Sequence, residues 1–170
     1  MEKEIWKDIN GYEGLYKISS YGRVKSFKLK NERILKNSKS FHDFYQVVLT
    51  KNKTEKSHKC HALVASHFVN NNNNYRYILH KDFDKKNINK DNLIWSQHKE
   101  TTYTQKKQKN KSSKYKGVSW RKLNEKWQVA ITKDQSRIYL GCFKKESDAG
   151  LAYNKAAKKL FGQFARLNKI

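Results

Sequence analysis

Proline is absent from this sequence, and only 7 of its 170 residues are glycine. These shortages exclude collagen-like chains and proline-rich linkers. Cysteine is scarce too, since Cys60 and Cys142 are the only two. Neither a disulfide framework nor a four-cysteine zinc ribbon can therefore form. This cysteine content predicts a protein of a reducing compartment.

Long apolar runs are also missing. No stretch of about 18 apolar residues occurs, and the first residues, MEKEIW, lack the apolar region of a secretory signal. A basic amphipathic helix of the kind that lies on membranes is not visible either. We therefore expect a soluble intracellular protein with no membrane partner. The length allows one large domain or two small ones.

Positive charge is the most prominent feature that is present. Lys and Arg number 38 against 15 Asp and Glu, for a net charge of +23. Every segment contributes, with +6 in residues 1–58, +4 in 59–99, +3 in 100–113 and +10 in 114–170. This spread excludes a neutral enzyme with a basic tail, and it predicts a nucleic-acid partner.

Residues 80–95, HKDFDKKNINKDNLIW, have the layout of a one-metal nuclease site. His80 ends an apolar strand-like run, and Asn92 follows a turn-rich loop. Histidine can take a proton from water near neutral pH, and oxygen ligands suit a hard cation such as magnesium. Alone, His80 would more often be structural and Asn92 more often a helix cap, so the prediction depends on their joint spacing. Neighbouring lysines are expected to hold DNA: Lys81, Lys85, Lys86 and Lys90.

The first half of the chain has mixed strand and helix patterns. Residues 5–26 predict a hairpin that turns through 19–22, and residues 44–50 predict a strand followed by a basic hairpin loop over 51–56. Residues 61–68 predict a short helix, and five asparagines over 70–74 predict a spacer. The spacing of His58, Cys60, His61 and His67 fits no common zinc pattern. The three histidines are therefore expected to be packed or hydrogen-bonded.

The second half begins with a low-complexity basic linker over 100–113. After it, residues 114–170 predict three strands and one helix. Ser147 or a neighbour is expected to cap the helix and Gly162 to end it, with an apolar stripe of Ala149, Ala152, Tyr153, Ala156 and Leu160. The outer sheet face would then carry the polar and basic residues Lys116, Arg121, Gln128, Thr132, Arg137 and Tyr139, which could enter a major groove.

The motifs YKGVSW, KWQVAI, YLGCF, AYNKAA and FGQFARLN resemble the plant ethylene-response-factor (APETALA-type) DNA-binding domain over about residues 113–169. The resemblance implies that the sheet face enters the major groove of double-stranded DNA. The expected DNA-binding residues are Lys116, Gly117, Ser119, Arg121, Gln128, Thr132, Arg137 and Tyr139. Ser119, Ala130 and Thr132 depart from residue types common in the plant proteins, so the plant target sequence is not expected to carry over.

Residues 61–95 resemble the HNH homing endonucleases of phages and mobile introns, through HALVASHF and then His80, Asp82, Asn87, Asn92, Leu93 and Trp95. Trp6, the run Gly11 to Gly14, and Gly22 to Val24 resemble the short module that precedes such domains. The resemblance implies a ββα-metal fold in which His80 and Asn92 are catalytic, and Asn92 and Asp82 hold a single Mg²⁺ or other divalent ion. His61, Asn87 and Trp95 would be structural.

Two positions depart from that family. Leu79 replaces the usual Asp or Asn metal ligand before the histidine, and Phe83 replaces a usual glycine. The predicted fold class is α+β, with an N-terminal module (1–27), an HNH nuclease-like domain (28–99), the linker, and the DNA-binding domain (114–170), in a monomer. Three functions remain open: an endonuclease that nicks or cuts DNA, a DNA-binding protein that has lost catalysis, and an RNA-binding basic protein.

Overall fold

The computed structural model describes residues 3–40, 42–97, 100, 103–105 and 112–170. The chain divides into two compact units, residues 1–97 (unit 1) and residues 98–170 (unit 2). Parts of the predicted linker, residues 101–102 and 106–111, lie outside the described residues. Among the described residues, no helix combines the length and apolar character needed to cross a membrane.

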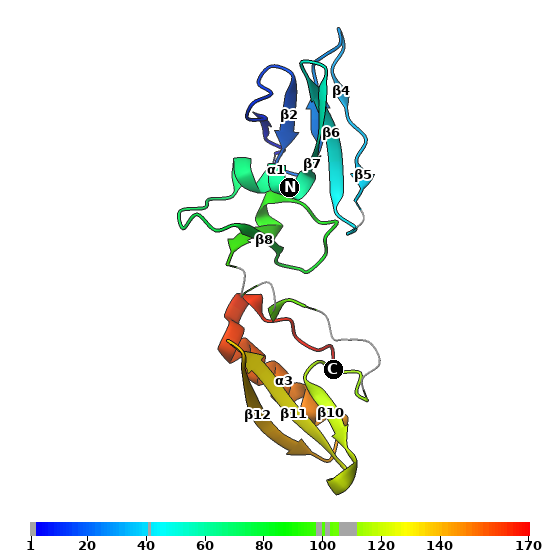
Figure 1. Ribbon diagram of the computed structural model, residues 1–170, viewed down its shortest axis with the longest axis vertical. Helices are drawn as coiled ribbons and strands as arrows, with labels where there is room; N and C mark the ends of the chain where they lie inside the picture. Colours follow the sequence, from blue (N-terminus) through cyan, green and yellow to red (C-terminus); the bar gives the residue numbers. More distant parts are fainter. Residues whose placement is uncertain (1–2, 41, 98–99, 101–102, 106–111) are drawn as a thin grey trace. The chain divides into compact units, whose positions relative to one another are not determined.

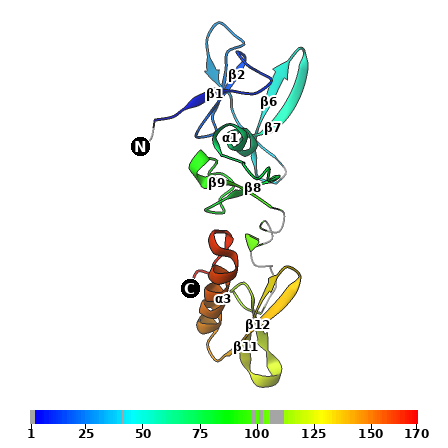
Figure 2. The same cartoon turned by 90° about the vertical axis from the view of Figure 1, so that its left-hand side faces the viewer.

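Unit 1 contains three small antiparallel sheets around one helix (Figures 1 and 2). The first sheet consists of β1 (Trp6–Asp8), β2 (Tyr16–Ser19), β3 (Val24–Ser26) and β4 (Arg33–Ile34). The second consists of β5 (Ser38–Lys39), β6 (Tyr45–Lys51) and β7 (Thr54–Lys59), and the third of β8 (Tyr77–His80) and β9 (Leu93–Ser96). Helix α1 (Cys60–Phe68) contacts strands of all three sheets, and the short helix η1 (Lys90–Asn92) precedes β9.

One hydrophobic core joins these elements. Ile18 and Val24 of the first sheet belong to the same buried cluster as Leu49 of β6, Val64 of α1 and Leu93 of β9. The predicted boundary at residue 27 therefore falls inside a single packed unit. Each small sheet has too few strands to bury its apolar face alone, so the sheets share the apolar surface of α1.

The N-terminal hairpin also contacts the segment predicted to be functional. Gly22 lies at the β2–β3 turn with φ +83°, and a Cβ there would stand 2.3 Å from Ile88 Cδ1. The Lys90 backbone N–H donates to the Ser20 carbonyl at 2.9 Å. Only glycine suits both this left-handed backbone and this close approach. The hairpin therefore supports the loop between β8 and β9.

The strand and helix predictions for unit 1 largely agree with the structure. The strand expected over 44–50 is β6, and the helix expected over 61–68 is α1. The predicted hairpin loop over 51–56 is too long, because β7 already begins at Thr54. Asn52 and Lys53 have φ values of +50° and +63°, and this two-residue turn suits the twist of the flanking strands.

Unit 2 is a three-stranded antiparallel sheet packed on one helix, as predicted. It comprises β10 (Val118–Arg121), η2 (Lys122–Asn124), β11 (Lys126–Lys133), β12 (Ser136–Phe143), α3 (Glu146–Phe161) and η3 (Gly162–Phe164). Gly162 follows the helix with φ +52°, as expected for a helix-ending glycine. Tyr103 stacks on Phe161 with ring centroids 4.0 Å apart, so this residue of the predicted linker is packed in the unit.

Two details of α3 differ from the prediction. Ser147 is not the cap, since the helix begins at Glu146 and Lys145 makes no side-chain cap bond. The buried stripe is Ala149, Tyr153, Ala157 and Phe161, whereas Ala152, Ala156 and Leu160 are only half-buried. These four buried residues are spaced four apart, so they lie along one inclined ridge of the helix, and that ridge contacts the sheet.

Candidate functional site

The predicted site lies at the end of β8 and in the loop that leads to β9. His80 is the last residue of β8 and pairs with Leu93 of β9. After it the chain turns, with the Phe83 backbone N–H donating to the His80 carbonyl at 3.0 Å and Phe83 at φ +62°. A left-handed φ is uncommon for a bulky residue, which explains why glycine would suit this position.

A network of side-chain hydrogen bonds braces this loop. The Asn92 amide donates to Asp82 Oδ1 at 2.9 Å and to the Asn87 carbonyl at 2.6 Å. Asn92 Oδ1 accepts from the Asp82 backbone N–H at 3.0 Å, and Asn87 Nδ2 donates to Asp82 Oδ2 at 2.6 Å. The structure therefore brings together the three predicted residues Asp82, Asn87 and Asn92, in an arrangement that holds the loop closed.

These bonds bear on the predicted metal site. Asp82 Oδ1 also accepts from the Asp84 backbone N–H at 2.8 Å, so both carboxylate oxygens are engaged. Among the described residues, no group of three or more His, Cys, Asp or Glu side chains could hold a metal ion. Leu79 offers no ligand atom. A Mg²⁺ ion held by Asp82 and Asn92 would therefore share their oxygens with the hydrogen bonds of the loop.

Asn92→Ala should destabilise unit 1 even when a chelator is present. The substitution removes three side-chain hydrogen bonds of the loop, which at about 1 kcal/mol each corresponds to roughly 2–3 kcal/mol of unfolding free energy. Urea unfolding in EDTA measures it, with Asn73→Ala in the exposed asparagine run as the matched control. Unchanged stability of Asn92→Ala would show that these hydrogen bonds do not stabilise the fold.

His80 is a buried imidazole with an unused nitrogen. The side chain is 7 % exposed, and Nε2 is buried without a hydrogen-bond partner. Burial lowers the pKa of His80, and the nearby Asp82 and Asp84 partly oppose this effect. A neutral imidazole with a free lone pair can accept a proton. Because Nε2 is shielded, a substrate reaches it only after covering side chains move.

His61 and Phe44 lie against His80. The His61 and His80 ring centroids are 5.5 Å apart, and Phe44 lies 4.5 Å from His61 and 6.1 Å from His80. His61 Nδ1 is also buried without a partner. The sequence predicted a structural role for His61 but offered no signal for Phe44, which comes from a separate loop.

The stability of unit 1 should fall as the pH decreases from about 6.5 to 4. Burial lowers the pKa of His61 to about 4, with smaller effects of His80 and Lys59. The unfolded chain, with a histidine pKa near 6.5, binds the proton first, so the stabilisation present above that pH is lost towards pH 4, by roughly 3 kcal/mol. Urea unfolding at pH 7 and pH 4.5 measures this loss. His61→Gln should reduce the difference in unfolding free energy between the two pH values, whereas His67→Gln should leave it unchanged. An equal pH dependence of His61→Gln and the natural protein would contradict the prediction.

The remaining residues around the site have structural partners. Trp95 Nε1 donates to the Val69 carbonyl at 3.1 Å. His58 Nε2 lies 3.2 Å from the Tyr12 hydroxyl, and His67 bonds the Leu63 carbonyl at 2.7 Å and the Asn10 N–H at 3.1 Å. His58 and His67 are thus satisfied histidines, as the sequence predicted.

The outer face of the unit 2 sheet carries the predicted DNA-binding side chains. Strand register pairs Ser119 with Gln128 and Thr132 with Arg137. A bulge between Val129 and Ala130 shifts the β12 register, and Ala130 faces Tyr139, which is 56 % exposed. With Val129 and Ile131 buried on the helix side, the opposite face carries Ser119, Arg121, Gln128, Thr132, Arg137 and Tyr139.

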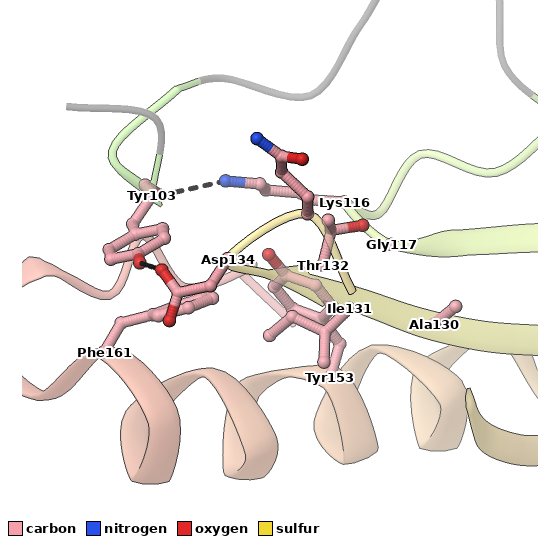
Figure 3. A pocket seen from close by; sticks show the side chains of 10 residues that line it. Tyr103, Lys116, Gly117, Ala130, Ile131, Thr132, Asp134, Tyr153 and Phe161 are labelled. Carbon is pink, nitrogen blue, oxygen red and sulfur yellow. Dashed lines mark hydrogen bonds between the residues drawn. The ribbon is translucent and has the colours of Figure 1, made fainter. Parts of the chain in front are cut away.

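Lys116 is not a free cation of that face. It lines a pocket of about 710 Å³ in unit 2, where Nζ donates to the Tyr103 carbonyl at 2.9 Å (Figure 3). Nζ also donates to the Gln105 carbonyl at 2.9 Å. Burial and then the charge of Arg166 lower the pKa of Lys116 to about 8. Neighbouring Gly117 has a packing role, because a Cβ there would meet the Tyr153 ring at 2.2 Å. The structure thus places both residues in the packing of the unit.

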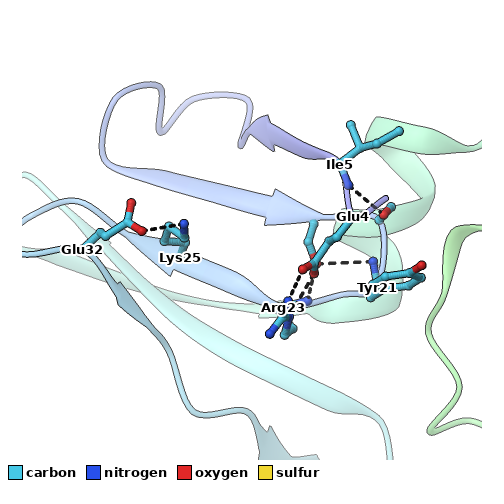
Figure 4. A network of polar contacts seen from close by, with 8 residues as sticks. Glu4, Ile5, Tyr21, Arg23, Lys25 and Glu32 are labelled. Carbon is cyan, nitrogen blue, oxygen red and sulfur yellow. Dashed lines mark hydrogen bonds and ion pairs between the residues drawn. The ribbon is translucent and has the colours of Figure 1, made fainter. Parts of the chain in front are cut away.

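The first sheet of unit 1 has a polar network that the sequence did not reveal (Figure 4). Arg23 Nε donates to Glu4 Oε1 at 2.9 Å, and Lys25 pairs with Glu32 at 2.7 Å. Both cations also lie over the Trp6 ring, at 5.8 Å for Arg23 and 4.8 Å for Lys25. Because carboxylates neutralise these cations, this face is less suited to phosphate than the unit 2 sheet.

Comparison with known proteins finds a family model, curated relatives and a solved structure that match parts of the chain. Residues 4–50 match the family described as NUMOD4 motif. The chain is 36% identical to DNA endonuclease I-HmuI of Bacillus phage SP01 over 90 residues, which cover 53% of this chain and 51% of that protein. It is also 36% identical to the uncharacterized HNH endonuclease L245 of Acanthamoeba polyphaga mimivirus over 94 residues, 55% of this chain and 27% of that protein.

A third relative and a solved structure complete the comparison. Over 56 residues, 32% of this chain and 16% of the relative, the chain is 43% identical to dehydration-responsive element-binding protein 2C of Arabidopsis thaliana. The solved structure, described as DNA binding and cleavage by the HNH homing endonuclease I-HmuI, matches with a TM-score of 0.52 and 35% identity over 60% of this chain and 56% of that one. The chain spans about half the length of I-HmuI. These matches confirm the resemblance to HNH homing endonucleases and a mixed α/β fold.

Proposed function

We propose that this relative of HNH homing endonucleases binds double-stranded DNA and hydrolyses its phosphodiester bonds. The observation that carries the proposal is His80, a buried imidazole whose Nε2 has no partner at the end of a braced β8–β9 pair. Unit 1 would supply the chemistry, and the basic outer face of unit 2 would supply much of the DNA affinity.

In this mechanism His80 Nε2 takes a proton from a water molecule. The water oxygen bonds to phosphorus, the bond from phosphorus to the leaving deoxyribose oxygen breaks, and that oxygen takes a proton from solvent. The braced loop of Asp82, Asn87 and Asn92 keeps His80 in place. A divalent ion, where it binds, would stabilise negative charge on the phosphoryl oxygens.

The finer structural features belong to the same proposal. We infer a ββα-metal arrangement in which β8 and β9 are the two strands. A single Mg²⁺ or similar divalent ion belongs to the proposal, and Asn92 and Asp82 are the residues that would hold it. A monomer acting inside the cell is also expected.

Nicking of supercoiled plasmid by the purified chain in magnesium, compared with EDTA, tests the proposal. Accumulation of open-circular or linear DNA would support it. Leu79→Asp and Leu79→Asn restore the oxygen ligand that the family carries at this position, so both should raise the rate. If the natural chain leaves plasmid intact while either variant nicks it, the natural sequence is not an active endonuclease and the proposal is wrong.

A second function, DNA binding without cleavage, is favoured by Leu79 and by the engagement of Asn92 and Asp82 in hydrogen bonds. It predicts specific binding in the absence of metal and no change in background nicking on His80→Ala. Competition between duplex DNA and RNA distinguishes both functions from RNA binding. Tighter binding of RNA would exclude them.

Arg137→Ala should weaken DNA binding by about 1–3 kcal/mol if this side chain contacts a base or a phosphate. For a phosphate contact, the slope of log affinity against log salt should become shallower by about 0.9. Fluorescence anisotropy at several salt concentrations measures both values. Lys159→Ala, an exposed lysine on α3, is the control and should leave them unchanged. Equal effects of the two variants would show that the sheet face does not contact DNA.

A further inference from the structure

Three side chains from separate elements of unit 1 meet beside His80. Phe44 precedes β6, Lys59 ends β7, and Lys85 lies in the loop between β8 and η1. Lys85 Nζ is 4.6 Å and Lys59 Nζ is 5.6 Å from the Phe44 ring centroid. The ring itself lies beside His61 and His80. We refer to Phe44, Lys59 and Lys85 as the Phe44–lysine cluster.

The two ammonium groups are positioned by contacts. A cation above an aromatic face is attracted by the negative charge of the ring. Lys85 Nζ also donates to the His42 carbonyl at 3.0 Å. Both side chains are otherwise exposed, so their remaining N–H donors can meet a ligand from solvent.

Two of the other three lysines of the loop are engaged elsewhere. Lys81 Nζ donates to the Asp91 carbonyl at 2.7 Å, and Lys90 pairs with the Asp91 carboxylate at 2.8 Å. Of the two carboxylates that act on His80, Asp82 is turned into the loop by its hydrogen bonds. The positive charge directed towards the His80 side therefore comes from Lys85 and Lys59.

We propose that the Phe44–lysine cluster is a phosphate-binding site that places a phosphodiester of DNA next to His80. Phosphate is recognised by ammonium donors, and two of them can share its oxygens. The cluster would supply positive charge where Leu79 provides no ligand for a metal ion, at the oxygens on which negative charge builds during hydrolysis. That the phosphate belongs to DNA rests on the proposed function.

Titration with inorganic phosphate in EDTA tests the site without DNA or cleavage. In NMR spectra of the full chain, the His61 and His80 ring signals should shift with phosphate, and saturation should need at least tenfold more phosphate in the Lys59→Ala/Lys85→Ala double variant. Lys59 makes no side-chain cap bond to α1, so its replacement leaves the helix start intact. Lys56→Ala, which replaces an exposed lysine of β7 in the same unit, is the matched control and should titrate like the natural chain.

Phe44→Leu should also weaken phosphate binding, because it removes the ring that positions both lysines while keeping an apolar side chain. Ring signals that do not move with phosphate, or that move equally in the double variant and the natural chain, would overturn the proposal.

A nicking assay separates this proposal from the proposed function. If the natural chain nicks plasmid, the double variant should be 10- to 100-fold slower and Lys56→Ala close to the natural rate. Equal rates for the natural chain and the double variant would overturn the role at His80. If the natural chain does not nick, the proposed function fails, and the phosphate titration alone still decides whether the site exists.

Discussion

His80→Gln should lower the plasmid nicking rate by about 10²- to 10⁴-fold, the range over which a positioned general base accelerates a reaction. Glutamine retains polarity and similar length but cannot take a proton from water at neutral pH. His80 qualifies as the base because its Nε2 is buried without a hydrogen-bond partner, and burial lowers the pKa of the imidazole, which favours the neutral form. DNA affinity should stay within about twofold, because the lysines around the site remain.

His58→Gln provides the matched control, since His58 is a histidine of the same unit whose ring already bonds the Tyr12 hydroxyl. It should nick at nearly the natural rate once folding is verified by circular dichroism. If His80→Gln retains more than a tenth of the natural rate, another group takes the proton and the proposed mechanism is wrong.

Gly117→Ala should destabilise unit 2 by roughly 3–5 kcal/mol, combining a left-handed backbone penalty with a steric clash. Gly117 has φ +77°, and a Cβ there would meet the Tyr153 ring at 2.2 Å and the Ala130 carbonyl oxygen at 2.8 Å. The second contact is with backbone, so no side-chain rotation relieves it. Thermal unfolding followed by tryptophan fluorescence and NMR measures the loss.

Gly162→Ala separates the two contributions, because Gly162 also has a positive φ, +52°, but nothing lies within 4 Å of its added Cβ. It should cost about 1–3 kcal/mol, from backbone strain alone. Signals of unit 1 should be unchanged by either variant, because the two units have separate cores. A DNA-binding defect in Gly117→Ala without loss of stability would instead restore the direct DNA contact that the sequence predicted for this glycine.

Periodic patterns made much of the fold predictable. The alternation of apolar and polar residues over 126–143 predicted β11 and β12, and Gly162 predicted the end of α3. These features depend on neighbours within a few residues along the chain. The predicted apolar stripe of α3 was right at Ala149 and Tyr153 but placed Ala156 where Ala157 is buried, because the two alanines are equally apolar and only contact with the sheet selects one of them.

The sequence by itself determined the basic character of the chain, the loop from His80 to Asn92 and the alternation that faces Arg137 outward, since each is set by composition or local spacing. Tertiary structure decided how these residues are used. It engaged Asn92 and Lys116 in internal hydrogen bonds, merged the N-terminal hairpin with the nuclease-like core, and brought Phe44 and Lys59 to His80. Such outcomes depend on contacts between segments far apart in the chain, for which a single sequence carries no local signal.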